Sequence, residues 1–267
     1  MEHSFYIISW TDVFVSLALV ALCLFLIRWW RIGLEKIIII GTIRSFIQLS
    51  VMGYVLTFFF GLEHWIYMVC LIMLMILIAS FEANRRLDIP IKGYFMMNVY
   101  SMSITVFIVL GTTLQFILDV EPWFYPYAMI PIAGMIIGNG LNSATLTTNR
   151  FIGELKHRED EIETLLALGA SPRAAVDTSI REAIRAALIP NINGLMLVGL
   201  VQIPGVMTGQ IIAGIDPLIA IRYQIMIMYM WLTTATLANV LTQAMVYRQF
   251  FTSNMQLRKE LFRVNNR

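Results

Sequence analysis

Charged side chains are scarce in this chain of 267 residues. Asp, Glu, Lys and Arg make up 13% of it, against 58% for hydrophobic residues, whereas a soluble domain carries roughly 25% charged residues. So few charges cannot cover a folded surface with polar groups, and the mean hydropathy is +0.74. We therefore expect an all-α integral membrane protein with lipid around most of its surface, and no nucleic-acid partner.

Cysteines and enzyme motifs are also few or absent. Cys23 and Cys70 fall in apolar runs, so no disulfide framework is expected. The sequence contains no G-x-x-x-x-G-K-[ST] phosphate loop, no H-E-x-x-H, no C-x-x-C and no G-x-S-x-G. We therefore expect this chain to be no enzyme, and any ATP hydrolysis that drives it to come from another chain.

Long apolar runs are what the sequence does contain. Seven are long enough to cross a bilayer, which takes about 20 residues per helix: 12–28, 37–60, 65–81, 94–118, 126–148, 191–214 and 219–247. Seven crossings would put 17 of the 19 Lys and Arg on one side, and basic loops stay in the cytosol. We expect a single permease domain over 1–267, with its N-terminus outside and its C-terminus cytosolic.

One polar stretch, 150–190, lies between the expected fifth and sixth spans. Apolar residues recur at helical spacing before Gly169, which is expected to end that helix. Ser171 is expected to cap a second helix that has Pro172 at its first position, and Pro190 to end it. The stretch therefore predicts a cytosolic helix-turn-helix.

Two interpretations of this helix-turn-helix remain open. It could lie on the lipid headgroups, or its corner could dock in a groove of a partner chain. The short Gly-Ala-Ser-Pro corner favours docking because it points a turn away from the bilayer. The residues expected to contact the partner are Glu163, Leu165, Leu166, Gly169, Ala170, Ser171, Pro172 and Arg173.

The segment "ETLLALGAS" resembles the cytosolic coupling loop of ABC-transporter permeases. Glu163 and Gly169 match its Glu and Gly six residues apart, but Thr164 and Leu165 replace its two alanines. Longer stretches, "PIAGMIIGNGLNSATLTTNR" (131–150) and "REAIRAALIPNINGLMLVGLVQIPGVMTGQIIAGIDPLIAIRYQI" (181–225), resemble the FetB-like permeases, a bacterial family associated with iron export. They are also similar to the membrane half of plant aluminium-tolerance ABC transporters.

The resemblance implies a permease homodimer in the bacterial inner membrane, with two copies of an ABC ATPase subunit on its cytosolic face. It also implies that ATP and magnesium bind to that partner and that this chain carries no cofactor. The implied activity is export of iron, or of another metal or small solute, from the cytosol.

Polar side chains inside the expected spans are candidates for a substrate path, because they are costly in lipid. Arg44 is the only charge well inside a span. The alternative for most of the others is that they join helices by hydrogen bonds. The candidates are Arg44, Gln48, Asn98, Asn139, Asn142, Met207, Thr208 and Gln210.

The metal ligands of any such path stay unknown. Apart from Asp12 at the first position of the first span, the expected spans contain no His or carboxylate, the ligands that would suit iron best, whereas the 17 methionines would favour softer metals. A chelated, neutral or organic substrate fits this composition equally well, so iron is suggested by the resemblance alone.

Two other classes of function also stay open. A self-contained channel or secondary transporter would need more ionisable residues in its spans than Arg44, and a membrane enzyme would need clustered His or acids.

Two pairs of glycines in the expected spans have the G-x-x-x-G spacing: Gly134 with Gly138, and Gly205 with Gly209. Such pairs serve either a dimer seam or packing within one subunit.

Overall fold

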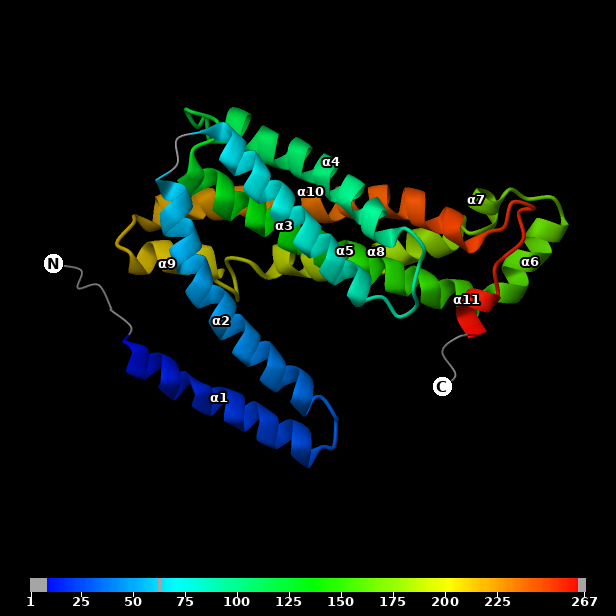
Figure 1. The fold of residues 1–267 in the computed structure, drawn as a ribbon, viewed down its shortest axis with the longest axis horizontal. Coiled ribbons are helices and arrows are strands. Elements are labelled where there is room, and N and C mark those ends of the chain that lie inside the picture. Colours follow the sequence, from blue (N-terminus) through cyan, green and yellow to red (C-terminus); the bar gives the residue numbers. More distant parts are fainter. Residues whose placement is uncertain (1–8, 62–63, 264–267) are drawn as a thin grey trace.

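The computed structural model describes residues 9–61 and 64–263, and in them the chain is helical, with two isolated β-bridges and no extended strand (Figure 1). The helices in chain order are α1 (Trp10–Trp29), α2 (Glu35–Phe60), α3 (Trp65–Arg85), α4 (Tyr94–Thr112), η1 (Thr113–Ile117), α5 (Pro126–His157), α6 (Glu159–Ala167), α7 (Pro172–Ala175), α8 (Asp177–Leu197), α9 (Gly205–Ile212), α10 (Pro217–Val246), η2 (Tyr247–Phe250) and α11 (Glu260–Arg263).

Six helical segments in the described residues are long and apolar enough to cross a membrane. They are α1, α2, α3, α4 with η1, α5, and α10 with η2. The prediction of an all-α, multi-pass membrane protein is therefore confirmed.

The expected sixth span, 191–214, is not one helix. Helix α8 ends at Leu197, residues 198–204 are irregular, and α9 begins at Gly205. The break has a local cause: Gly199 has a φ of 81°, a left-handed conformation that glycine adopts readily. Pro204, the N-cap of α9, has no N–H to continue a helix.

Pro190 lies inside α8, so the prediction that it ends this helix was wrong. A proline removes one backbone hydrogen bond, but membrane helices tolerate this where neighbouring groups or water satisfy the freed carbonyl. Pro190 lies on the wall of a cavity that also has polar side chains, among them Asn191.

The packed core lies around α5 and α10, which contact each other, and α3, α4 and α8 pack against one or both of them. Helices α1 and α2 form a hairpin that diverges from this bundle, so that α1 stands away from it while the C-terminal end of α2 packs against it through Leu56 and Phe60 (Figure 1). No described residue of either helix is buried. Because both helices are mostly apolar and leave many large apolar side chains exposed, lipid or another protein surface is expected to cover them.

Among the described glycines, Gly140 has the least room for a side chain. A Cβ added there would lie 3.0 Å from Met102 Sδ on α4 and 3.3 Å from Thr234 Cγ2 on α10. At Gly138, on the same helix, an added Cβ would meet nothing within 4 Å.

We expect Gly140→Val to destabilise the purified protein by about 1–3 kcal/mol through overpacking, whereas Gly138→Val leaves the fold of the single chain unchanged. The two melting temperatures in the same detergent test this. Equal values for both variants would contradict the packing described here. A selective loss of dimer in Gly138→Val would place that glycine in a seam between copies.

The helix-turn-helix forms largely as predicted. Helix α5 continues unbroken to His157, α6 follows it, and Gly169 adopts a φ of 90° at the corner. The Ala174 N–H donates to Ser171 Oγ (3.3 Å), and Pro172 is the first residue of α7. The second helix differs in being split at Val176 into α7, of a single turn, and α8.

Candidate functional site

A cavity of about 350 Å³ lies beside the break between α8 and α9. Helices α5, α8 and α10 and the irregular segment 198–204 form its wall. Asn139 and Trp231 lie roughly 20 Å along α5 and α10 from their N-terminal ends, at 1.5 Å per residue. This distance is shorter than the roughly 30 Å thickness of a bilayer core, which suits a cavity at membrane depth. Its polar wall residues are Asn139, Asn142, Ser143, Asn191, Gln202 and Trp231.

Two hydrogen bonds fix which amide atoms of the wall stay available. Asn139 Nδ2 donates to the Trp231 carbonyl (2.7 Å), which leaves its Oδ1 as an acceptor. Arg86 Nη1 donates to Asn142 Oδ1 (3.1 Å). Because arginine can only donate, the orientation of the Asn142 amide is set and its Nδ2 remains a donor.

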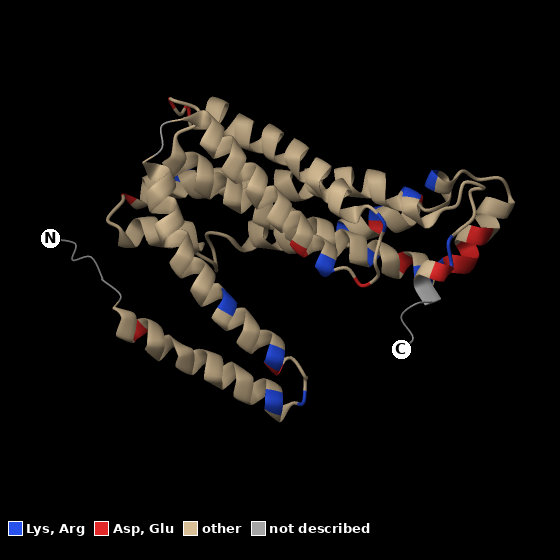
Figure 2. Ribbon diagram, in the orientation of Figure 1, with Lys and Arg blue, Asp and Glu red and all other residues tan. Residues whose placement is uncertain are grey.

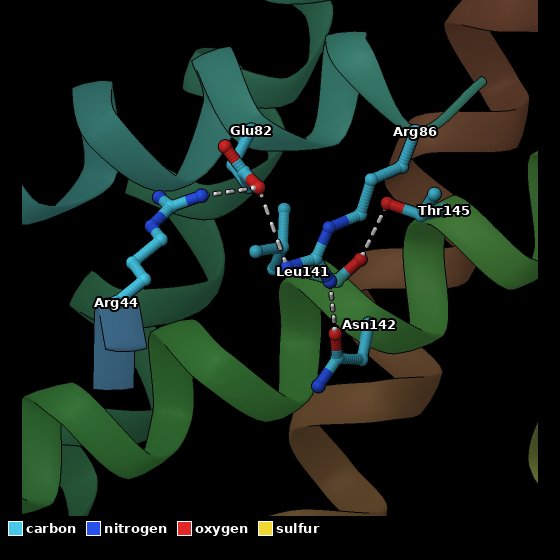
Figure 3. A network of polar contacts seen from close by, with 6 residues as sticks. All are labelled: Arg44, Glu82, Arg86, Leu141, Asn142 and Thr145. Carbon is cyan, nitrogen blue, oxygen red and sulfur yellow. Dashed lines mark hydrogen bonds and ion pairs between the residues drawn. The ribbon is translucent and has the colours of Figure 1, made fainter. Parts of the chain in front are cut away.

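A charge network adjoins this wall (Figure 3). Arg44 Nη1 on α2 lies 3.2 Å from Glu82 Oε1 on α3, and Arg86 Nη2 lies 3.6 Å from the same oxygen. Arg86 then reaches Asn142 on α5. The network therefore connects α2, α3 and α5, and it ends at a residue that lines the cavity.

Sequence reasoning missed Glu82 as the partner of Arg44. It ended the third span at 81, whereas α3 continues to Arg85. The spacing of Glu82 and Arg86, four residues apart, was the available signal for an ion pair on one helix face.

The predicted substrate-path residues do not all lie at one site. Of these eight, Asn139 and Asn142 line the cavity, and Arg44 is linked to it through the charge network. Asn98 is fully buried in α4, away from the cavity wall, and Gln48 is exposed on α2. The three from α9, Met207, Thr208 and Gln210, follow the cavity-lining residue Gly205 but are not part of the wall.

The predicted coupling corner has a groove of about 640 Å³ beside it. One wall comes from α6 and the corner, and the other from residues 254–257 of the C-terminal tail. Lys259 Nζ lies 2.6 Å from Glu163 Oε1 and 3.0 Å from Glu159 Oε1, which ties the tail to α6. Hydrogen bonds with Glu163 and then Glu159 raise the pKa of Lys259, so its charge is kept at neutral pH.

The predicted coupling residues differ in how accessible their side chains are to a partner. Leu165 and Leu166 pack partly against the chain's own core. Arg173 pairs with Asp177 (3.4 Å) and its Cζ lies 5.5 Å from the centroid of the Tyr247 ring. Leu168, which was not among the predicted residues, is 80% exposed at the corner. It is the apolar side chain most available to a partner there.

Comparison with known proteins gives close relatives along nearly the whole chain. Residues 10–251 match the model described as "Uncharacterised protein family (UPF0014)". The chain is 38% identical over 257 residues to the "UPF0014 membrane protein slr1647" of Synechocystis sp., which covers 96% of this chain and 99% of that protein.

Two further relatives have more informative names. The chain is 36% identical over 244 residues to the "Probable iron export permease protein FetB" of Escherichia coli, covering 91% of this chain and 92% of that one. It is 34% identical over 250 residues to the "Protein ALUMINUM SENSITIVE 3" of Arabidopsis thaliana, covering 92% and 89%. No solved structure matches the chain.

Proposed function

Because this chain belongs to the UPF0014 family of membrane proteins, we propose that it is the membrane-spanning permease subunit of an ATP-driven transporter. The observation that carries this proposal is its similarity, over nine-tenths of its length, to a protein named as an iron export permease. The expected activity is export of iron, or of another metal or small solute, from the cytosol by way of the cavity beside α8 and α9.

The proposed topology has seven crossings, of which the sixth is the discontinuous pair α8 and α9. Non-helical backbone at membrane depth is tolerated where it lines a cavity or is buried in protein, and the irregular segment 198–204 adjoins the cavity. Lys and Arg gather in two places, the end of the molecule that holds α6 and the C-terminus and the turn that joins α1 to α2 (Figure 2). In the proposed topology both places lie on the same side of the membrane. Basic ends stay in the cytosol, so this side is proposed to be cytosolic and the N-terminus external.

Cysteine labelling checks this orientation. With Cys23 and Cys70 replaced by serine, Glu121→Cys should react with an impermeant maleimide added to intact cells. Arg258→Cys should react only after the membrane is opened, because it lies in the tail beside α6. Labelling of Arg258→Cys in intact cells would reverse the proposed orientation.

The corner between α6 and α7 is proposed to dock on the ATPase subunit. Helix α6 carries Glu159, Asp160, Glu161 and Glu163, and anionic lipid would repel such a helix. This charge favours docking on a protein over lying on headgroups. Helix α5, which α6 follows, could act as a lever, since its 32 residues extend about 48 Å at 1.5 Å per residue.

The complete transporter is proposed to be a homodimer of this chain with two ATPase subunits. ATP and magnesium would bind to those subunits, since no phosphate loop occurs in this chain. Helices α1 and α2, with no buried residue in their described parts, offer apolar surface for the second copy.

Inside-out vesicles that contain the chain and its ATPase subunit test the proposed function. Iron supplied outside these vesicles should accumulate within them when ATP is added, and ADP should not replace ATP. Equal accumulation without ATP would overturn the proposal in favour of a channel or secondary transporter.

A further inference from the structure

We infer that the groove of about 640 Å³ beside the corner receives a protruding segment of the ATPase subunit, and that this segment carries a Lys or Arg next to an apolar side chain. The inference rests on the proposed function and adds the surface through which the two chains meet. The sequence indicated only that the corner could enter a groove of its partner, whereas the structure places a groove on this chain. The C-terminal tail, which forms the second wall, is therefore part of the docking surface.

The tail wall of this groove is held in place by the chain itself. The tail turns back on itself there, and the Thr252 N–H donates to the Gln256 carbonyl (2.8 Å). Phe251 and Leu257, at the two ends of the turn, are buried and paired in an isolated β-bridge. The two ion pairs of Lys259 then tie the tail to α6. A groove whose walls are already fixed loses little conformational freedom when a partner binds.

Met255 lies at the tip of this turn and lines the groove. Its side chain is 59% exposed, and its φ of 60° is a left-handed conformation that residues with a side chain rarely adopt. The turn holds it there, because the Met255 N–H donates to the Thr252 carbonyl (3.0 Å). Strained residues of this kind gather at ligand-binding elements. Leu166 is part of the opposite wall, so an apolar side chain of the partner would lie between two apolar residues.

The charge around the groove favours a basic partner. Figure 2 shows the acidic residues of α6, which are Glu159, Asp160, Glu161 and Glu163. Only Arg158 and Lys259 pair with them among the described residues, and the exposed Asp160 makes no ion pair there. Glu163 lies in the groove wall, beside the carboxyl end of α6, and such a helix end carries a partial negative charge. A Lys or Arg of the partner is therefore attracted to this wall, whereas an anionic segment or lipid is repelled.

The affinity of the purified chain for the ABC ATPase subunit of its own organism, measured in detergent, tests this inference. Met255→Gly should weaken binding about tenfold or more, the effect of losing one buried apolar side chain. Glycine adopts the left-handed conformation readily, so the melting temperature of the chain should not fall. Met255→Leu, which keeps an apolar side chain, is the matched control and should bind as the unaltered chain does.

A second pair of variants tests the charge of the partner. Glu163→Gln should weaken binding roughly two- to fivefold, as expected for a partly exposed ion pair, and should make the affinity less dependent on salt. Lys259 keeps its pair with Glu159 in this variant, so the tail stays attached to α6. Glu161→Gln is the matched control, because it makes the same change on α6 outside the groove wall, and it should leave the affinity unchanged.

An affinity that Met255→Gly leaves unchanged would overturn the inference, and so would equal effects of Glu163→Gln and Glu161→Gln. If Met255→Gly instead dissociates the ATPase-free chain into a smaller species during size-exclusion chromatography, the groove lies between two copies of this chain and the inference fails. The proposed function is tested separately by the unaltered chain. If that chain binds no ATPase, the proposed function fails, whereas binding that every variant retains eliminates the groove alone.

Discussion

Leu168→Asp is expected to release the ATPase subunit from the purified transporter. Leu168 is 80% exposed at the corner that follows α6, so its replacement costs the fold of this chain little. Burying a leucine in a partner's pocket contributes roughly 1.5–3 kcal/mol, and an aspartate there would add the cost of burying a charge. The affinity should fall by at least about 100-fold.

Retention of the ATPase during size-exclusion chromatography measures this effect. Leu168→Met, which keeps an apolar side chain, is the matched control and should retain the subunit. Met255→Asp changes the opposite wall of the groove, where Met255 is 59% exposed, and tests whether the tail shares in docking. Undiminished retention in Leu168→Asp, with normal transport, would eliminate the corner as the docking site.

Changes at Leu165 or Gly169 would give a less clear result. Leu165 packs partly against the chain's own core, so a charge there would also disturb folding. Gly169 has a φ of 90°, a conformation that other residues adopt only with strain. Loss of the ATPase from either variant could therefore follow from a damaged corner.

The second large effect is expected at Glu82, whose carboxylate is shared by two arginines. Glu82→Leu should destabilise the protein by roughly 0.5–2 kcal/mol, because it removes two ion pairs whose arginines are about half exposed, and such pairs contribute roughly 0.2–1 kcal/mol each. Arg44→Leu should cost less, because Arg86 still pairs with Glu82 at 3.6 Å. The double variant Arg44→Leu, Glu82→Leu should be more stable than Glu82→Leu alone.

Unfolding of the four proteins in one detergent gives this double-mutant cycle. Arg222→Leu is a useful control, since Arg222 lies at the other end of the bundle and has no salt bridge in the described chain. If Glu82→Leu is as stable as the unaltered chain, the network makes no contribution to the fold.

Local patterns in the sequence were enough to predict the corner and most of the membrane helices. Apolar runs of sufficient length mark the six continuous segments, and Gly169, Ser171 and Pro172 mark the turn by their own backbone preferences. These features depend on residues near one another in the chain, which is why they could be read without the fold.

Features that depend on distant residues could not be predicted in this way. Glu82 is 38 residues from Arg44, and Lys259 is about a hundred positions from Glu163. The break at 198–204 lies in a run whose composition is as apolar as that of a continuous span. Gly199 and Pro204 interrupt this run, but glycine and proline also occur inside membrane helices, as Pro131 and Pro190 do here.

ATP hydrolysis by the purified complex tests the permease assignment most directly. The tagged chain is produced together with an ABC ATPase subunit of its own organism and purified from the membrane by its tag alone. The two chains should elute together in equal amounts and hydrolyse ATP, and Leu168→Asp should abolish both results. If the chain elutes without the ATPase, and ATP-independent iron transport persists in vesicles, it is not a subunit of an ATP-driven transporter.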